Sequence, residues 1–328
     1  MPPKGTLESR LARLTELGEL PMTAAVEHEL LAALADGSNL VVARAAEVMG
    51  RSGQEAFLPH LMAAFDRLLR QPATADKTCR AKEAIVHALE ALGCREAEPF
   101  QRGARHVQME PVFGGKVDTA TILRCDCALA LARLRDPDAH FTLAALLTDL
   151  EAQPRQAAAR ALAFLGDEKS ELLLRLKALT GDADPAVLEA CFTGLLGIEP
   201  ERSLAFVGQF LDENRPVIAE QAALALGESH LEGAFPLLRR CYEVSADLQF
   251  TRGLLLPMAL TRSDAAVYFL LTVINDEGRG AALKAVAALA IYAADPRIRR
   301  RVHDAVTARK DEKVTEAYDE LFGAEGAE

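Results

Sequence analysis

The side chains that could support metal binding are scattered along this sequence. His28 and Glu29 begin like the zinc-binding HExxH motif, but Ala32 stands where the second histidine is needed. Cys125 and Cys127 are two residues apart within a segment of helical periodicity. Residues i and i+2 of a helix point to different sides, so this pair differs from the cysteines of a metal knuckle. The seven histidines fall in seven separate segments. The sequence therefore predicts no metal ion and no cofactor.

Motifs for nucleotide binding and nucleophilic catalysis are also incomplete. Gly114–Lys116 resembles part of a phosphate loop, but it lacks the GxxxxGK[ST] spacing and no strand is predicted before it. The sequence contains no GxSxG elbow, and nothing marks a Ser/His/Asp triad. The acidic pairs Asp182/Asp184 and Glu199/Glu201 lie in predicted turns, where helix capping explains them. We therefore predict that the protein is not an enzyme.

The segment Met109–Thr119 is the strongest candidate for ligand binding. It combines the aromatic ring of Phe113, the acid Glu110, and two glycines, Gly114 and Gly115, that allow close approach of a backbone. It is the longest insertion between two predicted helices of a pair, and long loops on rigid scaffolds often carry binding residues. The alternative is that the insertion only routes the chain and that Phe113 fills a gap between helices.

These residues are set into a sequence that repeats one phrase. Pro154–Asp167 reads as a helix with a proline at its start and Gly166 at its end, and Asp138–Leu150 before it is a second amphipathic segment. Similar phrases occur at Val41–Gly53, Lys82–Gly93, Arg124–Asp136, Pro185–Gly197, Val217–Ser229, Arg252–Asp264 and Leu283–Pro296. They recur roughly every 31–33 residues in the second half and about every 40 in the first, which is typical of stacked helix pairs. The periodicity predicts an all-α solenoid of about eight helical hairpins.

The repeated phrase resembles HEAT repeats, including the HEAT-like repeats of phycobilin lyases, over roughly residues 20–310. The resemblance is carried by Arg155 with Gly166–Asp167, by Arg124 with Asp136, and by Arg252 with Asp264. It implies a right-handed α-solenoid with a ladder of Arg–Asp contacts between neighbouring repeats. The arginine position is occupied by other residues elsewhere: Val42, Lys82, Ala186, Ala219 and Leu283. The resemblance specifies a shape rather than an activity.

Composition limits the possible partners and compartments. With 37 basic and 48 acidic residues the net charge is −11, which disfavours nucleic-acid and anionic-membrane binding. The six cysteines show no disulfide spacing and indicate a reducing compartment. The first residues, MPPKGTLESRLARL, contain no apolar signal core, and no apolar run reaches membrane-spanning length. We expect a cytoplasmic protein with no membrane or nucleic-acid partner; the sequence leaves its oligomeric state open.

The chain is predicted to form a single solenoid domain, residues 1–328, with distinct ends. Residues 1–20 and 296–322 are expected to form capping helices, residues 109–119 an inserted loop, and residues 323–328 a frayed acidic tail. Asp118 or Thr119 should cap the helix after the insertion, and Glu96–Val107 should be helical. Pro257 should kink the helix Leu248–Leu260, because it removes a backbone donor.

The second helix of each pair is expected to line the inner face of the solenoid. Aligning the repeats gives a stripe that is acidic at first, with Glu47, Glu83, His87 and Glu90, and then small and apolar. Its later members are Cys125 with Leu129, Gln156 with Arg160, Val187 with Cys191, Glu220 with Leu224, Gly253 with Pro257, and Lys284 with Ala288. Such a groove suits an extended peptide or an amphipathic helix. If the alignment is displaced by one residue, the apolar members are instead buried between helices.

The function that the sequence favours is a non-enzymatic scaffold for a protein or peptide partner. The predicted binding residues are Glu83, His87, Glu90, Glu110, Phe113, Gly114, Gly115, Arg124, Arg160 and Glu220. The resemblance to phycobilin lyases leaves open a lyase-like or chaperone-like role on a bound chromophore or cofactor. Resemblance to HEAT-like DNA glycosylases is a third interpretation, against which the net charge and the absence of tryptophan weigh.

Overall fold

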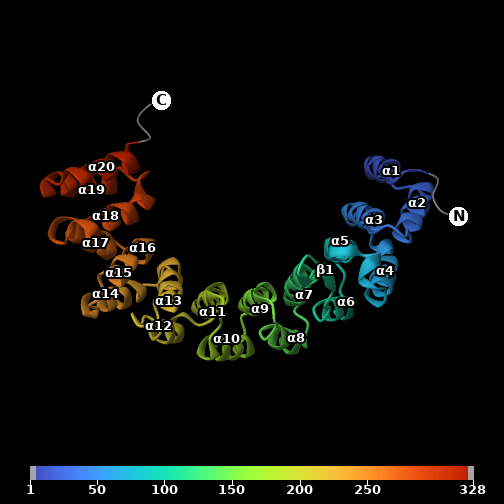
Figure 1. Cartoon of the computed structure of the whole chain (residues 1–328), viewed down its shortest axis with the longest axis horizontal. Coiled ribbons are helices and arrows are strands. Elements are labelled where there is room, and N and C mark those ends of the chain that lie inside the picture. The colour runs from blue at the N-terminus through green and yellow to red at the C-terminus, as the bar shows by residue number, and fades with distance from the viewer. Residues whose placement is uncertain (1–4, 324–328) are drawn as a thin grey trace. The chain divides into compact units, whose positions relative to one another are not determined.

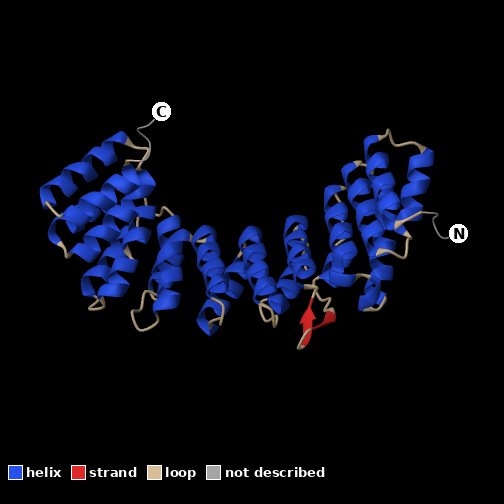
Figure 2. Ribbon diagram, turned by 45° about the horizontal axis from the view of Figure 1, so that its top comes forward, coloured by secondary structure: helices blue, strands red, loops and turns tan. Residues whose placement is uncertain are grey.

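The structure, a computed structural model, describes residues 5–323 and is built almost entirely of α-helices (Figures 1 and 2). The protein is an all-α solenoid, in which consecutive helices pack as hairpins and, within each of its two units, each hairpin packs against the next. The chain divides into two compact units, the first ending at Leu165 and the second beginning at Gly166. Within residues 5–323, no helix is both long and apolar enough to cross a membrane.

The first unit contains the only two strands among the described residues. Its helices are α1 (Leu7–Glu19), α2 (Ala24–Leu34), α3 (Asn39–Arg51), α4 (Leu58–Arg70), α5 (Arg80–Ala91), α6 (Glu98–Gly103), α7 (Thr121–Leu134), α8 (Ala139–Leu146) and α9 (Ala152–Leu165). Between α6 and α7 lie the strands β1 (Met109–Val112) and β2 (Gly115–Asp118). Helices α1, α3, α5, α7 and α9 pack side by side in that order, and we call them the second-helix row. Helices α2, α4, α6 and α8 pack behind this row (Figure 1).

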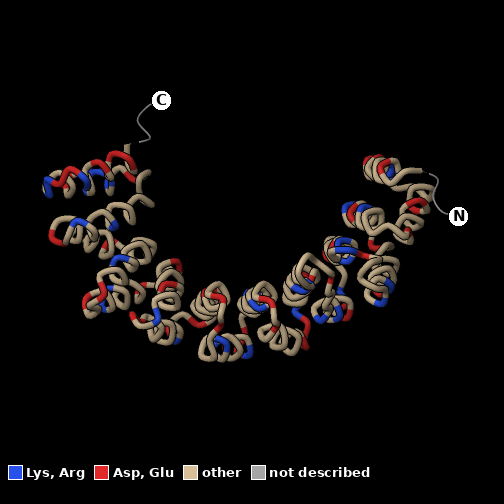
Figure 3. The backbone as a smooth tube through the Cα atoms, in the orientation of Figure 1, with Lys and Arg blue, Asp and Glu red and all other residues tan. Residues whose placement is uncertain are grey.

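The second unit repeats this arrangement. Its helices are α10 (Glu168–Thr180), α11 (Pro185–Ile198), α12 (Pro200–Gly208), α13 (Pro216–Glu228), α14 (Ala234–Val244), α15 (Leu248–Gly253), α16 (Leu255–Leu260), α17 (Asp264–Asp276), α18 (Arg279–Leu289), α19 (Pro296–Arg309) and α20 (Glu312–Phe322). Here α11, α13, α16, α18 and α20 pack side by side. Acidic and basic residues are distributed along the helices of both units (Figure 3).

Small residues set the close spacing of neighbouring second helices. A Cβ atom on Gly50 of α3 would lie 3.0 Å from Cα of Ala88 on α5. A Cβ on Gly227 of α13 would lie 2.4 Å from the carbonyl oxygen of Pro257 on α16. The alanines of the repeated phrase are buried at the same interfaces, among them Ala158 and Ala222. This packing explains why the repeats are rich in alanine and glycine.

An aspartate precedes most second helices and organises the turn before them. Its carboxylate accepts a hydrogen bond from the backbone N–H two residues later, which is an Asx turn. The pairs are Asp36–Ser38, Asp118–Ala120, Asp149–Glu151, Asp182–Asp184, Asp212–Asn214 and Asp247–Gln249, with O···N distances of 2.7–3.0 Å. Asp76 does the same for α5 at longer range, accepting from the N–H groups of Ala81 and Lys82. The N-cap position of α5 itself is occupied by Cys79.

The ends and breaks of several helices coincide with features of the sequence. Helices are present at both ends of the described chain: α1 within residues 1–20, and α19 and α20 within 296–322. Gly166 ends α9 with a left-handed φ of +69°. The helix containing Pro257 is broken into α15 and α16 at the residues one turn before the proline, where its ring would clash. Of the predicted tail, residues 323–328, the structure describes Gly323, and residues 324–328 lie outside the described residues.

The insertion and its flanks differ from the prediction. Residues 109–118 form a paired hairpin rather than an irregular loop, and the helix predicted over Glu96–Val107 is confined to α6. Ala120, not Asp118 or Thr119, occupies the N-cap position of α7 and makes no side-chain cap. The carboxylate of Asp118 is nevertheless used, because it accepts the Ala120 N–H at 3.0 Å. Helix α9 starts at Ala152, two residues before Pro154.

Candidate binding site

The insertion between α6 and α7 is a β-hairpin with a two-residue turn. Strands β1 and β2 pair antiparallel, with Met109 opposite Asp118 and Val112 opposite Gly115. Phe113 and Gly114 form the turn, and Gly114 has a φ of +89°, in the left-handed region that favours glycine. Figure 2 shows the strands projecting from the helices of the first unit. Gly114 therefore serves the turn rather than a phosphate loop, and Gly115 begins β2.

The hairpin exposes most of its apolar side chains. Phe113 at the turn is fully exposed. Large apolar side chains around it are exposed as well, and together we call them the hairpin surface: Val107, Met109, Val112, Phe113, Val117 and Ile122. The interpretation that Phe113 fills a gap between helices is therefore wrong. Clusters of exposed apolar groups of this kind commonly mark interaction sites.

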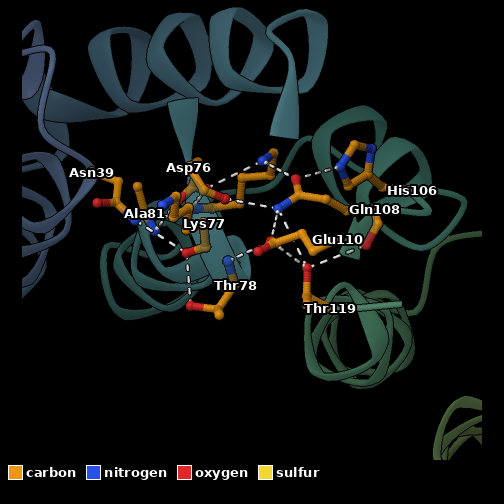
Figure 4. Close-up of polar contacts among 10 residues, drawn as sticks. Asn39, Asp76, Lys77, Thr78, Ala81, His106, Gln108, Glu110 and Thr119 are labelled. Atoms are coloured by element: carbon orange, nitrogen blue, oxygen red, sulfur yellow. Dashed lines mark hydrogen bonds and ion pairs between the residues drawn. The ribbon is translucent and has the colours of Figure 1, made fainter. Parts of the chain in front are cut away.

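Glu110 anchors the hairpin to the start of α5 (Figure 4). Its Oε1 accepts hydrogen bonds from the Thr78 backbone N–H at 2.6 Å, the Thr119 hydroxyl at 2.7 Å and the Gln108 Nε2 at 2.8 Å. Partial burial favours the neutral acid, but these bonds outweigh it and lower the pKa of Glu110. Glu110 thus holds the hairpin in place through its Oε1 atom.

A buried polar network lies beneath Glu110. Nζ of Lys82 lies 3.2 Å from Oδ2 of Asp76 and 2.8 Å from Oε1 of Gln108. Nε2 of Gln108 donates to the Asp76 carbonyl oxygen at 2.8 Å (Figure 4). All three side chains are buried, and the lysine and aspartate side chains are each 1% exposed. Because buried charges need partners, this network ties the foot of β1 to α5 and fixes the hairpin's position.

Arg124 of α7 holds the other foot of the hairpin. Its Nη1 donates to Oδ2 of Asp118 at 2.7 Å, and its Nη2 to Oδ1 of Asp149 at 3.0 Å. The side chain is 2% exposed, so it cannot contact a ligand as predicted. The aspartate that Arg124 contacts in the next repeat is Asp149, whereas Asp136 accepts a hydrogen bond from Gln101. Arg124 is a structural link between the turns preceding α7 and α9.

The predicted acidic stripe of the second-helix row lines an open groove between α3 and α5. The groove has a volume of about 490 Å³. Its floor is made of small residues, namely Gly50, Ala84, Ala88 and Ala91. Its walls are charged, with Arg44, Glu47, Arg51, Arg80, Glu83 and His87. The structure therefore brings Glu83 and His87 together, as the sequence predicted.

Electrostatic coupling extends from this groove to α7. Nε2 of His87 lies 2.9 Å from Oδ2 of Asp126, and this hydrogen bond raises the pKa of His87. Partial burial, followed by repulsion from Asp126, raises the pKa of Glu83 to about 7. Glu90, the third predicted member, is paired with Arg133 at 2.6 Å outside the groove. The groove thus contains a carboxyl group that titrates close to neutral pH.

The remaining predicted residues are not gathered at this site. Arg160 is exposed on α9, and Glu220 is exposed on α13 in the second unit. The apolar middle of the predicted stripe is wrong at Val187 and Cys191, which are fully buried between helices. The alternative, in which the apolar members are buried, therefore holds for this pair, whereas Cys125 and Leu129 are half-buried.

Cysteine chemistry is disfavoured by burial. Burial raises the thiol pKa of Cys79 and Cys191 to about 12 and that of Cys125 to about 11, so each is protonated at neutral pH. Cys127 is fully buried. Within residues 5–323, no group of three His, Cys, Asp or Glu side chains is arranged to hold a metal ion. These thiols pack as small apolar groups.

Comparison with solved structures places the chain among helical-repeat proteins. A chain in a homology model of the full-length AP-3 complex in an intermediate open conformation aligns with a TM-score of 0.52 and 14% identity, covering 90% of this chain. The match covers 58% of that chain, so this protein spans a little over half its length. At this identity the likeness shows the fold alone, which is that of an all-α helical-repeat protein.

Two other solved structures align over most of their length but less closely in space. One is the CpcE–CpcF complex of phycocyanin lyase from Nostoc, which aligns with a TM-score of 0.33 and 17% identity and covers 92% of this chain and 96% of that one. The other is human deoxyhypusine hydroxylase in complex with glycerol, which aligns with a TM-score of 0.31 and 18% identity and covers 83% of this chain and 97% of that one. No protein-family model matches the sequence, and no curated protein matches it.

Proposed function

We propose that this protein is a non-enzymatic, HEAT-like scaffold that binds a protein or peptide partner through its first unit. The observation that carries this proposal is the hairpin, which combines a firmly anchored base with an apolar surface fully open to solvent. A solitary hairpin is marginally stable in water, so its conformation depends on the Glu110 and Arg124 anchors. Ordering it in advance reduces the entropy lost when a partner binds.

The chemistry of the hairpin surface fits a protein partner. Apolar and aromatic side chains such as Phe113 and Met109 are enriched at the centres of interfaces, where they are removed from water by the partner. The polar anchor residues below them are already saturated with internal hydrogen bonds. They are therefore suited to support a contact rather than to make one.

The second-helix row supplies a further part of the proposed binding surface. Thr78, which donates to Glu110, is two residues before Arg80, which lines the groove between α3 and α5. The hairpin anchor and the groove therefore share the start of α5. A partner held by both would contact apolar groups on one and charged groups on the other.

The test compares two exposed phenylalanines of the first unit. Phe113→Ser removes the ring at the hairpin turn, and the matched control Phe141→Ser removes an exposed ring from α8. Both variants and the unaltered protein are used as bait in a lysate of the native host, followed by quantitative mass spectrometry. We expect one or more proteins to be retained by the unaltered protein and the control but lost with Phe113→Ser.

Two outcomes contradict the proposal. One is an identical set of retained proteins for all three baits. The other is the absence of any reproducible protein together with a co-purifying small molecule in native mass spectrometry, which would favour the lyase-like or chaperone-like alternative.

A further inference from the structure

The groove between α3 and α5 has a defined order of charges along its length. The two helices run in the same direction, because Asn39 at the start of α3 hydrogen-bonds to the Lys77 carbonyl just before α5, while Gly50 near the end of α3 contacts Ala88 near the end of α5. Residues facing one another across the groove therefore differ by about 38 in number, as Gly50 and Ala88 do. This register allows the charged walls to be read as successive levels.

Three levels follow from this register. Arg44 and Arg80 lie at the end of the groove where the helices begin. Glu47 and Glu83 occupy the middle. Arg51 lies at the far end, level with the part of α5 between His87 and Ala91, so the order is positive, negative, positive. At about 1.5 Å per helical residue, the first two levels are separated by roughly 4–5 Å and the last two by roughly 7–8 Å.

At the middle level, a positive charge from a partner would stabilise the ionised carboxylate of Glu83. Glu83 is half-buried and lies near a second acid, Asp126, whose repulsion disfavours its ionised form. No hydrogen bond within residues 5–323 stabilises the Glu83 carboxylate. Arg44 is already paired with Glu47 at 2.9 Å, whereas Arg51 and Arg80 are exposed. A cationic side chain placed over Glu83 would relieve the repulsion between the two acids.

We infer that the groove binds an extended partner segment with a lysine or arginine at its centre and an acidic residue two positions to each side. In an extended chain, residues i and i+2 point to the same side and lie roughly 6–7 Å apart, a distance between the two separations of the levels. The central cation meets Glu83, and the flanking acids meet Arg80 and Arg51. This inference rests on the proposed partner-binding function and specifies the chemistry of one part of the partner.

Binding of this segment should depend on pH. The charged groups around Glu83 are Arg44, Glu47 and Arg51 of α3, Arg80 and His87 of α5, Asp76 before α5, and Asp126 of α7. As pH rises through about 7, Glu83 loses its proton. This change makes the middle level more negative, so affinity for a cation rises with pH.

The test uses two fluorescein-labelled, end-capped peptides with opposite charge order, GEAKAEG and GKAEAKG, titrated with the full chain at about 20 mM salt, where screening is weak. Fluorescence anisotropy gives each dissociation constant. We expect the first peptide to bind at least about tenfold more tightly than the second, and more tightly at pH 8 than at pH 6. Glu83→Gln should remove most of this preference and its pH dependence, whereas Glu19→Gln on α1 should leave both unchanged.

A charge exchange makes the assignment of the ends specific. Arg80→Glu should weaken GEAKAEG and improve binding of a peptide in which one flanking glutamate is lysine, GKAKAEG or its reverse order GEAKAKG. The inference is overturned if neither peptide binds, if both bind equally, or if Glu83→Gln binds as the unaltered protein does. If one of these results is obtained but a partner is still captured in a manner that depends on Phe113, only the groove inference is overturned. If the peptides bind as expected but no captured protein depends on Phe113, only the scaffold proposal based on the hairpin is overturned.

Discussion

Lys82 and Asp76 form an ion pair, with Nζ and Oδ2 3.2 Å apart, in which each side chain is only 1% exposed. Oε1 of Gln108 accepts a second hydrogen bond from the lysine and connects the pair to the hairpin. A helical repeat packs without charges in its core, so this pair is explained by what it supports rather than by the repeat itself. It links the second-helix row to the hairpin, the one non-helical element among the described residues.

Removing the lysine should therefore destabilise the first unit strongly. Lys82→Met leaves Asp76 buried without its cation, and we expect the free energy of unfolding to fall by about 3–5 kcal/mol. The matched control is Arg133→Met, which breaks the solvent-exposed pair with Glu90 and should cost less than about 1 kcal/mol. Urea denaturation followed by circular dichroism measures both. Similar losses for the two variants would show that the buried pair has no special role.

The general architecture could be predicted from the sequence because it depends on local features. Repeated phrases of helical periodicity, ended by residues such as Gly166 and interrupted by Pro257, define helix pairs whose stacking follows from their apolar faces. The recurring aspartates before the second helices are a further local signal. In Asp76–Lys82 and Asp118–Arg124, an aspartate stands six residues before the buried lysine or arginine with which it pairs.

The site was harder to predict because it depends on contacts between distant segments. Glu110 and Phe113 stood out by residue type, but only the fold shows that the acid faces Thr78 and the ring faces solvent. The pairing of β1 with β2 was missed because Pro111 and two glycines weaken the strand pattern. The sequence predicts a binding role at the surface for Arg124. Its burial could not be predicted, because its two partners, Asp118 and Asp149, come from turns that are distant in the sequence.

The hairpin turn allows a comparison of adjacent glycines. Gly114→Ala places a side chain at φ +89° and should destabilise the hairpin by about 1 kcal/mol, whereas a Cβ on Gly115 meets no neighbour and its φ needs no glycine. We expect amide hydrogen exchange across β1 and β2 to be several-fold faster in Gly114→Ala and almost unchanged in Gly115→Ala. Equal exchange in the two variants would contradict the assigned turn geometry.

The raised pKa of Glu83 predicts a specific pH dependence of stability. The folded state holds its proton more tightly than the unfolded state, whose pKa is the ordinary value of 4.5. The stabilising contribution of the neutral acid is therefore complete below about pH 4.5 and is lost as pH rises through about 7. Glu83→Gln should remove this decline, so its stability relative to the unaltered protein should increase from pH 5 to pH 8. A difference that stays constant over this range would show that Glu83 has an ordinary pKa.

The groove itself depends on the contact between Gly50 and Ala88. A Cβ on Gly50 would lie 3.0 Å from Cα of Ala88, a backbone atom that cannot move without shifting α5. Gly50→Ala should therefore destabilise the first unit by about 1–3 kcal/mol through overpacking. Gly197 of α11 provides the matched control, because its added Cβ meets no atom within 4 Å and alanine favours a helix there by up to about 1 kcal/mol. We expect the free energy of unfolding, measured by urea denaturation, to fall in Gly50→Ala and to rise in Gly197→Ala. If both substitutions stabilise the protein, α3 and α5 are not packed as closely as the groove requires, and its charged walls would lie farther apart than a single extended segment can bridge.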